Sequence, residues 1–174
     1  MKKNKIQNLT LIALMSAILC IMGPIVIPIG MVPMSFTNMA IYLTIILLDK
    51  KRATISVAIY LLIGFVGLPV FAGFTGGAGK LLGPTGGYLI GYLGLSWISG
   101  FIMERLEKSK ILALCLGTIC LYLVGTIWLM LQSKLGFATA ISVGVLPFLI
   151  FDIIKILVAI ALGNSIKKRI RWMV

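Results

Sequence analysis

The sequence predicts an all-α integral membrane protein, a bundle of six transmembrane helices with both termini in the cytoplasm. Hydrophobic residues make up 60% of the 174 positions and the mean hydropathy is +1.14, which is more apolar surface than a protein in water can bury. In addition, six apolar stretches approach the ~20 residues needed to cross the hydrocarbon core of a bilayer. They cover residues 9–28, 35–48, 53–69, 86–103, 111–131 and 143–166.

The stretches differ in length, and the second and third are the shortest. We therefore expect one of these two to be tilted or partly re-entrant. No tandem repeat and no low-complexity linker divides the sequence. We expect residues 1–174 to form a single domain.

Positive charge predicts the orientation of the bundle. The chain has 16 Lys and Arg against 4 Asp and Glu, a formal net charge of +12. With the amino terminus inside, the cytoplasmic segments hold Lys2, Lys3, Lys5, Lys50, Lys51, Arg52, Arg105, Lys108, Lys110, Lys167, Lys168, Arg169 and Arg171. Only Lys80 and Lys134 fall outside, and Lys155 lies within the sixth stretch. This bias follows the positive-inside rule and explains the charge without a nucleic-acid partner.

Several kinds of chemistry are not supported. The chain has no His, and only one of its acids, Asp152, lies within an apolar stretch. Cys20, Cys115 and Cys120 lie in apolar stretches without metal-ligand spacing. Gly79-Lys80 lacks the other residues of a phosphate-binding loop. We therefore expect no catalytic residue, no metal and no cofactor. We expect the lipid bilayer to surround the protein.

Asp152 and Lys155 are charges within the sixth apolar stretch. Each costs ~2.5–3.5 kcal/mol at the centre of a transmembrane helix, so their presence requires a reason. Their i,i+3 spacing places them on one helix face, where they can pair or hold one polar ligand. A purely structural ion pair facing the bundle interior is the alternative. Asp152 lies 15 residues before Lys167, roughly 22 Å at helical rise, so a ligand site there would open to the external side.

A glycine-rich segment, residues 67–88, follows the third apolar stretch and is expected to lie outside; we call it the lid segment. Glycines allow a backbone to approach a ligand closely, and aromatic residues offer flat apolar faces. A flexible hinge is the alternative, but a solvated linker would be less apolar. The residues of this segment that we expect to contact a ligand are Phe71, Phe74, Gly76, Gly77, Lys80, Thr85, Gly86 and Tyr88.

Two further groups of residues are candidates for contacts. Ser35 and Thr37, with Asn38, carry hydrogen-bonding groups near the expected outer surface, although they would equally suit a helix cap. Small residues recur at i,i+4 in Ala13 and Ala17, and again in Gly87 and Gly91. Such pairs allow close helix contact, either within the bundle or with a partner.

The lid segment also resembles a known family. Residues 67–73 (GLPVFAG) and 82–88 (LGPTGGY) resemble the signature of the BioY family, the biotin-specific S components of energy-coupling factor (ECF) vitamin transporters. The pair Asp152 and Lys155 is similar to that family's Asp-x-x-Lys, and residues 33–37 (PMSFT) are similar to its first external loop. The similarity extends over most of the chain.

This resemblance implies a six-helix subunit of the bacterial plasma membrane that captures biotin and joins a transmembrane T component and two cytoplasmic ATPases. It also implies that Ala13 and Ala17 contact the T component. We expect Asp152 to accept hydrogen bonds from the ureido ring of biotin and Lys80 to meet its carboxylate. The alternatives are an S component for another small carboxylated vitamin, a membrane enzyme acting on such a molecule, and an assembly subunit without a ligand.

Overall fold

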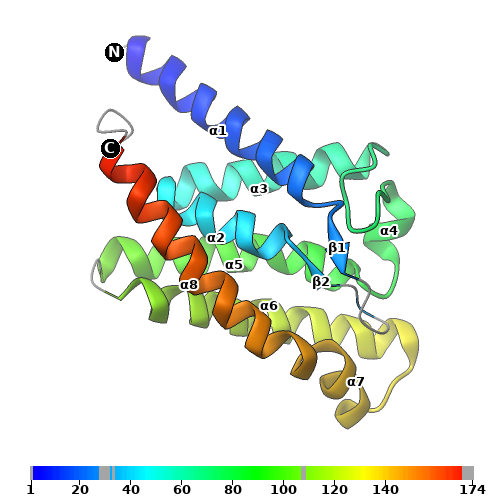
Figure 1. The fold of residues 1–174 in the computed structure, drawn as a ribbon. Helices are drawn as coiled ribbons and strands as arrows, with labels where there is room; N and C mark the ends of the chain where they lie inside the picture. The colour runs from blue at the N-terminus through cyan, green and yellow to red at the C-terminus, as the bar shows by residue number, and fades with distance from the viewer. Residues whose placement is uncertain (1, 28–31, 33, 107–108, 170–174) are drawn as a thin grey trace.

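The computed structural model describes residues 2–27, 32, 34–106 and 109–169. Within these residues the chain forms eight helices and one two-stranded sheet (Figure 1). The helices are α1 (Lys2–Met22), α2 (Thr37–Leu47), α3 (Lys50–Phe65), α4 (Ala78–Leu82), α5 (Gly86–Arg105), α6 (Lys110–Ser133), α7 (Phe137–Gly144) and α8 (Leu146–Arg169). The strands are β1 (Val26–Ile27) and β2 (Met34–Ser35).

Four helical stretches are long and apolar enough to cross a membrane: Lys5–Met22, Gly86–Arg105, Lys110–Ser133 and Phe137–Arg169. The prediction of a mostly helical membrane protein is confirmed at this level. Helices α2 and α3 have 11 and 16 residues, shorter than a perpendicular span requires. They correspond to the two apolar stretches expected to be short.

The structure differs from the sequence prediction in two ways. It has more helices than predicted, and it contains a short β-sheet, whereas an all-α fold was predicted. The described residues hold eight helices rather than six, because α4 forms inside the lid segment and α7 is separate from α8. Pro147 has no N–H to continue a helix from the preceding turn, so it favours a new start, and α8 begins one residue earlier at Leu146. The sheet pairs Val26 with Ser35 and Ile27 with Met34; β-branched residues after Pro24 favour this extended backbone.

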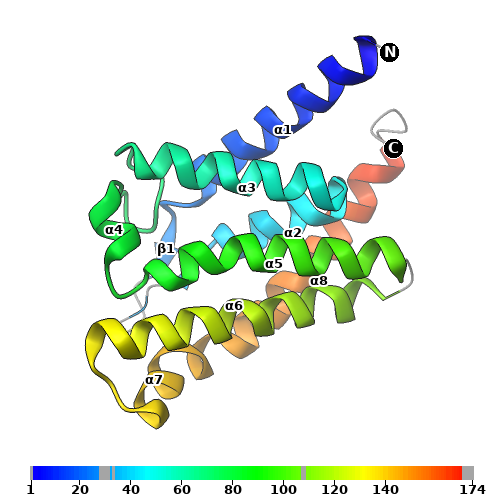
Figure 2. The same ribbon diagram turned by 180° about the vertical axis from the view of Figure 1, so that it is seen from behind.

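Small residues allow close packing between helices. Helix α5 packs along α6 (Figure 2), while α2 packs against α8 and α3 packs against both α1 and α5. A Cβ atom at Gly87 would collide with Trp128 of α6, and one at Gly91 would press on Leu121. The small-residue pair of α5 is therefore used within the bundle.

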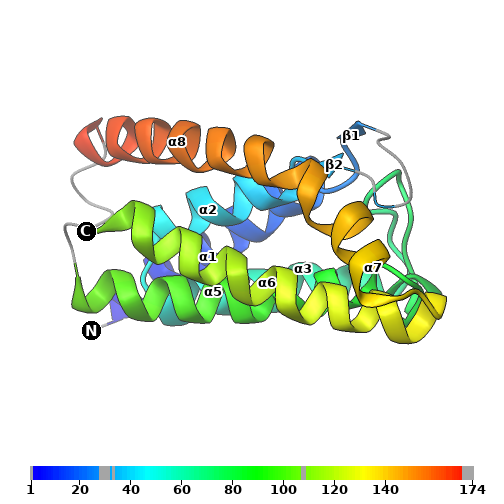
Figure 3. The same ribbon diagram turned by 90° about the horizontal axis from the view of Figure 1, so that it is seen from below.

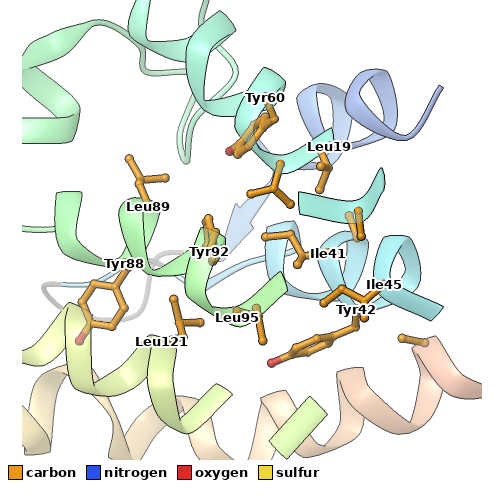
Figure 4. Packing of buried hydrophobic residues seen from close by; sticks show 14 of the residues in the cluster. Leu19, Ile41, Tyr42, Ile45, Tyr60, Tyr88, Leu89, Tyr92, Leu95 and Leu121 are labelled. Atoms are coloured by element: carbon orange, nitrogen blue, oxygen red, sulfur yellow. The ribbon is translucent and has the colours of Figure 1, made fainter. Parts of the chain in front are cut away.

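The hydrophobic core lies where α2, α3 and α5 meet α1 and α6. Figure 4 shows Leu19, Ile41, Tyr60 and Leu95 packed together in this core. Tyrosines are unusually frequent in it: Tyr42 and Tyr60 are fully buried, and Tyr88, Tyr92 and Tyr122 are nearly so. Because each buried hydroxyl needs a hydrogen-bond partner, these tyrosines also bring polar groups into the interior.

The two ends of the bundle carry different elements (Figures 1 and 3). One end holds the start of α1, the α2–α3 connection, the end of α5, the start of α6 and the end of α8. We call it the basic end because many of the cationic residues lie there. They are Lys50, Lys51, Arg52, Arg105, Lys110, Lys167, Lys168 and Arg169. The other end holds β1, β2, the lid segment and α7, with Lys80 and Lys134. We call this the lid end.

Candidate functional site

Helix α8 turns one face, which carries two charged residues, toward the interior of the bundle. Its buried residues recur every three to four positions, which is the spacing of a single helix face. They are Phe148, Asp152, Lys155, Ile156, Ala159 and Gly163. Asp152 is 2% exposed and Lys155 is 8% exposed, so both charges face the bundle rather than lipid.

Three side chains donate hydrogen bonds to the Asp152 carboxylate. Lys155 Nζ lies 3.1 Å from Oδ1, Asn38 Nδ2 donates to Oδ2 at 3.0 Å, and the Tyr122 hydroxyl donates to Oδ2 at 2.7 Å. These donors come from α8, α2 and α6. A carboxylate offers about four acceptor sites, so roughly one remains free, on Oδ1.

Lys155 is held from a second direction. Its Nζ donates to the backbone oxygen of Ser35 at 2.9 Å, and Ser35 Oγ donates to Thr37 Oγ1 at 3.0 Å. The residue at the N-cap position of α2 is Phe36, and no side chain caps this helix. Ser35 and Thr37 therefore belong to the polar network of the site and not to a helix cap.

A pocket lies over this network at the lid end. Residues from β2, the lid segment, α5, α6, α7 and α8 line it, among them Ser35, Lys80, Thr85, Tyr88, Asp152 and Lys155. The empty space between its atoms, including the mouth of the pocket, is about 600 Å³. The centre of a water-sized molecule fits in only about 60 Å³ of that space. One water needs ~10–15 Å³ by that measure, so the pocket has room for only a few water molecules and a larger ligand requires its walls to move.

The lid segment covers the pocket with only some of the residues expected to do so. Ala72, Lys80, Thr85 and Tyr88 line it, whereas the two phenylalanines do not. Phe71 is fully buried against Tyr60, edge to face with ring centroids 5.6 Å apart. Phe74 is 72% exposed and has a φ of 57°.

Glycines of the lid segment serve its backbone geometry rather than line the pocket. Gly77 has a φ of +88° and precedes α4, a conformation that other residues rarely adopt. A Cβ atom at Gly76 would collide with the backbone oxygen of Leu68, and one at Gly86 with that of Leu81. The segment is also tied to α6, because Trp128 Nε1 donates to the backbone oxygen of Gly83 at 2.9 Å.

Several residues at the pocket were not predicted from the sequence. Tyr92, Tyr122 and Phe148 line it. Asn38, which we had considered both as a ligand contact and as part of a helix cap, also lines it. The available signal was helical spacing: Tyr88 and Tyr92 recur at i,i+4 on α5, and Thr118, Tyr122 and Thr126 do so on α6. Such polar rows in apolar helices mark inward faces.

The pair Ala13 and Ala17 lies apart from this site. Both residues are exposed on α1, on the same side as exposed Leu9, Leu14 and Ile21. In a membrane this face is open to lipid or to another protein.

Comparison with known proteins places the chain in a family. The model of the BioY family matches residues 1–172. The chain belongs to the BioY family. The resemblance carried by the lid segment and by Asp152 and Lys155 is thereby confirmed. As a BioY protein with several helices that can cross a bilayer, it is a multi-pass protein of the plasma membrane.

Individual BioY relatives align along nearly the whole chain. "Biotin transporter BioY2" of Lactococcus lactis subsp. cremoris is 33% identical over 169 residues, covering 95% of this chain and 93% of the relative. "Biotin transporter BioY" of Thermotoga maritima is 37% identical over 155 residues, covering 88% and 91%. The fold is similar to the solved S-component for biotin of an ECF-type ABC transporter, with a TM-score of 0.89, 34% identity, and coverage of 97% of this chain and 94% of that one.

Proposed function

We propose that this chain is the biotin-binding S component of an ECF transporter and captures biotin from the external side for ATP-driven import. The observation that carries the proposal is the pocket in which the lid segment covers Asp152 and Lys155, at the opposite end from the basic residues. Relatives of matching length named as biotin transporters support it. An intramembrane ion pair is a functional site by default.

The proposed topology follows from the two ends of the bundle. Helices α1, α2, α3, α5, α6 and α8 are the six spans, residues 1–174 form one domain, and both termini are cytoplasmic. The basic end then faces the cytoplasm, as the positive-inside rule requires. The pocket faces outward, where biotin arrives.

Asp152 is the proposed partner of the ureido ring. An ionised carboxylate forms stronger hydrogen bonds with N–H groups than a neutral acceptor does. Three donors already occupy the carboxylate, so two ureido N–H groups cannot both bind unless one donor leaves. Asn38 is the least buried of the three and is the donor we expect to release.

Lys80 is the proposed partner of the biotin carboxylate. Asp152 and Lys155 together carry no net charge, so a bound carboxylate would leave the closed site at −1. An unpaired buried charge is costly, and Lys80 is the cation that the lid segment brings to the pocket. It therefore neutralises the tail.

The remaining contacts are divided between side chains and backbone. Tyr88 and Phe148 line the pocket and are placed to cover the apolar rings. Phe71 and Phe74 could contact biotin only after a change in the lid segment, since they do not line the pocket in this conformation. Of the other expected contacts, Ser35 and Thr85 line the pocket. The same kind of change would be needed for contacts from Thr37, Gly76, Gly77 and Gly86, which do not line it.

The division of labour within the transporter places ATP hydrolysis elsewhere. The chain is a transport subunit rather than an enzyme, needs no cofactor, and carries no phosphate-loop motif. We propose that a T component and two ATPases supply the energy. Exposed Ala13 and Ala17 on α1 suit close contact with a helix of the T component.

The test is equilibrium binding of radiolabelled biotin to the purified protein in detergent, with competition by other carboxylated vitamins. Saturable binding at one site per chain, displaced by biotin alone, is expected. Preferential displacement by another vitamin would reassign the substrate. Recovery of a chemically altered ligand by mass spectrometry would indicate an enzyme, and absence of binding by a folded protein would leave only an assembly role.

A further inference from the structure

A second cavity lies at the basic end of the bundle and shares no lining residue with the biotin pocket. It is formed by the end of α2, the start of α3, the end of α5, the start of α6 and the end of α8. Water-sized molecules can be centred in about 460 Å³ of it, and about 1040 Å³ lies between its atoms with the mouth included. It is therefore larger than the biotin pocket.

The carboxylates at this cavity are already engaged. Glu104 accepts hydrogen bonds from the backbone N–H of Lys50 at 3.0 Å and lies 3.3 Å from its Nζ. Asp49 accepts from the backbone N–H of Arg52 at 2.7 Å and lies 3.1 Å from its Nε. Of the four cationic residues that line the cavity, Lys50 and Arg52 are thus each paired with a carboxylate.

Lys110 and Lys167 are not balanced in this way. Across residues 2–27, 32, 34–106 and 109–169, neither forms an ion pair, and Lys110 donates to the neutral amide of Asn164. Both side chains are half-buried. Lys167 lines the same cavity as Lys110 and Arg52. Lys110 and Lys167, from two helices, therefore give the cavity a surplus of positive charge, beside the paired Arg52 of a third helix.

Such a surplus attracts an anion whose oxygens can accept from several cations at once. Phosphate oxygens match both the guanidinium of Arg52 and the ammonium groups of Lys110 and Lys167. The same cavity is lined by the apolar residues 45–48 and Met103, which suit the carbon atoms attached to a phosphate ester. Basic pockets between transmembrane helices at the cytoplasmic side hold anionic headgroups in this manner.

We propose that this cavity is a phosphate-binding site, with Arg52, Lys110 and Lys167 as its cationic contacts. The phosphate group comes either from an anionic phospholipid of the inner leaflet or from a soluble phosphate. The site is independent of biotin capture, because none of its residues lines the biotin pocket.

The experiment measures binding of short-chain phosphatidylglycerol to the full chain in detergent by native mass spectrometry, with phosphatidylcholine as the neutral-headgroup control. The variant is Lys110→Gln/Lys167→Gln. The matched control is Lys51→Gln/Lys168→Gln, which removes the same charge from exposed positions at the same end. We expect roughly 30-fold weaker binding of phosphatidylglycerol in the first variant, with little change in the control.

Biotin binding is measured on every variant and is expected to stay at the wild-type level, which shows that the fold is intact. If the glutamine variant does not fold, Lys110→Arg/Lys167→Arg is expected to fold and to retain the preference for phosphatidylglycerol. Inorganic phosphate is the second probe: displacement of the lipid by phosphate assigns the site to a soluble anion, and its failure to compete assigns the site to lipid. An equal loss in both glutamine variants, no loss in the first, or no preference over phosphatidylcholine in the wild type would each overturn the proposal.

Discussion

The hydroxyl of Tyr122 on α6 donates a hydrogen bond of 2.7 Å to Oδ2 of Asp152 on α8. Both residues are buried within the apolar interior, and both line the pocket at the lid end. This contact holds the carboxylate in place from a helix other than its own. It links the position of the Asp152 carboxylate to the packing of α6 against α8.

Replacing Tyr122 with Phe tests this link. Tyr122→Phe removes one donor to a charged acceptor and keeps the ring, which should cost about 1.5–3 kcal/mol of stability. We also expect roughly tenfold weaker biotin binding, because the carboxylate is less firmly oriented. Thermal unfolding and equilibrium binding measure the two effects.

Tyr42→Phe is the matched control. Tyr42 is another buried tyrosine whose hydroxyl forms one bond, to Thr118 Oγ1 at 2.9 Å, and it does not line the pocket. It should lose some stability and no biotin affinity. Equal effects of the two substitutions on affinity would show that Tyr122 has no special role.

The buried pair Asp152 and Lys155 should show strong energetic coupling. Removing one partner leaves a buried charge and costs about 3–5 kcal/mol, whereas removing both leaves none. Asp152→Asn/Lys155→Met should therefore be more stable than the sum of the single variants predicts, by ~1–3 kcal/mol. Thermal unfolding of the four proteins completes the cycle.

The pair Asp49 and Arg52 provides the comparison, since it has the same i,i+3 spacing and 3.1 Å separation at the surface. Its coupling should stay below about 1 kcal/mol because solvent screens it. Coupling of the buried pair no larger than this would contradict the view that Asp152 and Lys155 compensate each other.

Gly86→Ala should disturb the lid segment. The new Cβ atom would collide with the backbone oxygen of Leu81, so α4 and its residue Lys80 must shift. We expect a loss of about 1–3 kcal/mol in stability and weaker biotin binding. Gly79→Ala is the control, because a Cβ atom there meets nothing within 4 Å. Wild-type behaviour of Gly86→Ala would indicate that α4 is not fixed at this contact.

Lys80→Gln should change selectivity. If Lys80 neutralises the biotin tail, the variant loses the preference for biotin over its carboxyl-amidated analogue. Competition binding measures the ratio of the two affinities. Lys134→Gln, which removes an exposed cation at the same end, should keep the preference. A preserved ratio in Lys80→Gln would assign the tail to another residue.

The sequence predicted the long helices well because continuous apolar stretches determine them. It missed α7, because the sixth apolar stretch was placed at residues 143–166 and left most of residues 137–144 outside it. A helix of eight residues is too short to give the apolar signal of a span. The sequence prediction also missed the pairing of β1 with β2, which depends on contact between two segments of only two residues each. Such contacts leave no periodic signal.

The site was predictable to the extent that its residues are out of place in a membrane. Asp152 and Lys155 stood out as charges in an apolar stretch, and the structure places both in one pocket. Tyr92 and Tyr122 did not stand out, because tyrosine is compatible with an apolar helix. The positions of Phe71 and Phe74 depend on how the lid segment folds, which its composition does not specify.

The most direct test of the proposed binding site is the affinity of biotin for purified Asp152→Asn, compared with Asp49→Asn. The structure predicts that the first substitution weakens binding by about 10- to 100-fold or more, as expected for loss of a charged acceptor. The second lies at the basic end and should bind like the wild type. Wild-type affinity in a folded Asp152→Asn protein would contradict the assignment of this carboxylate to the ligand.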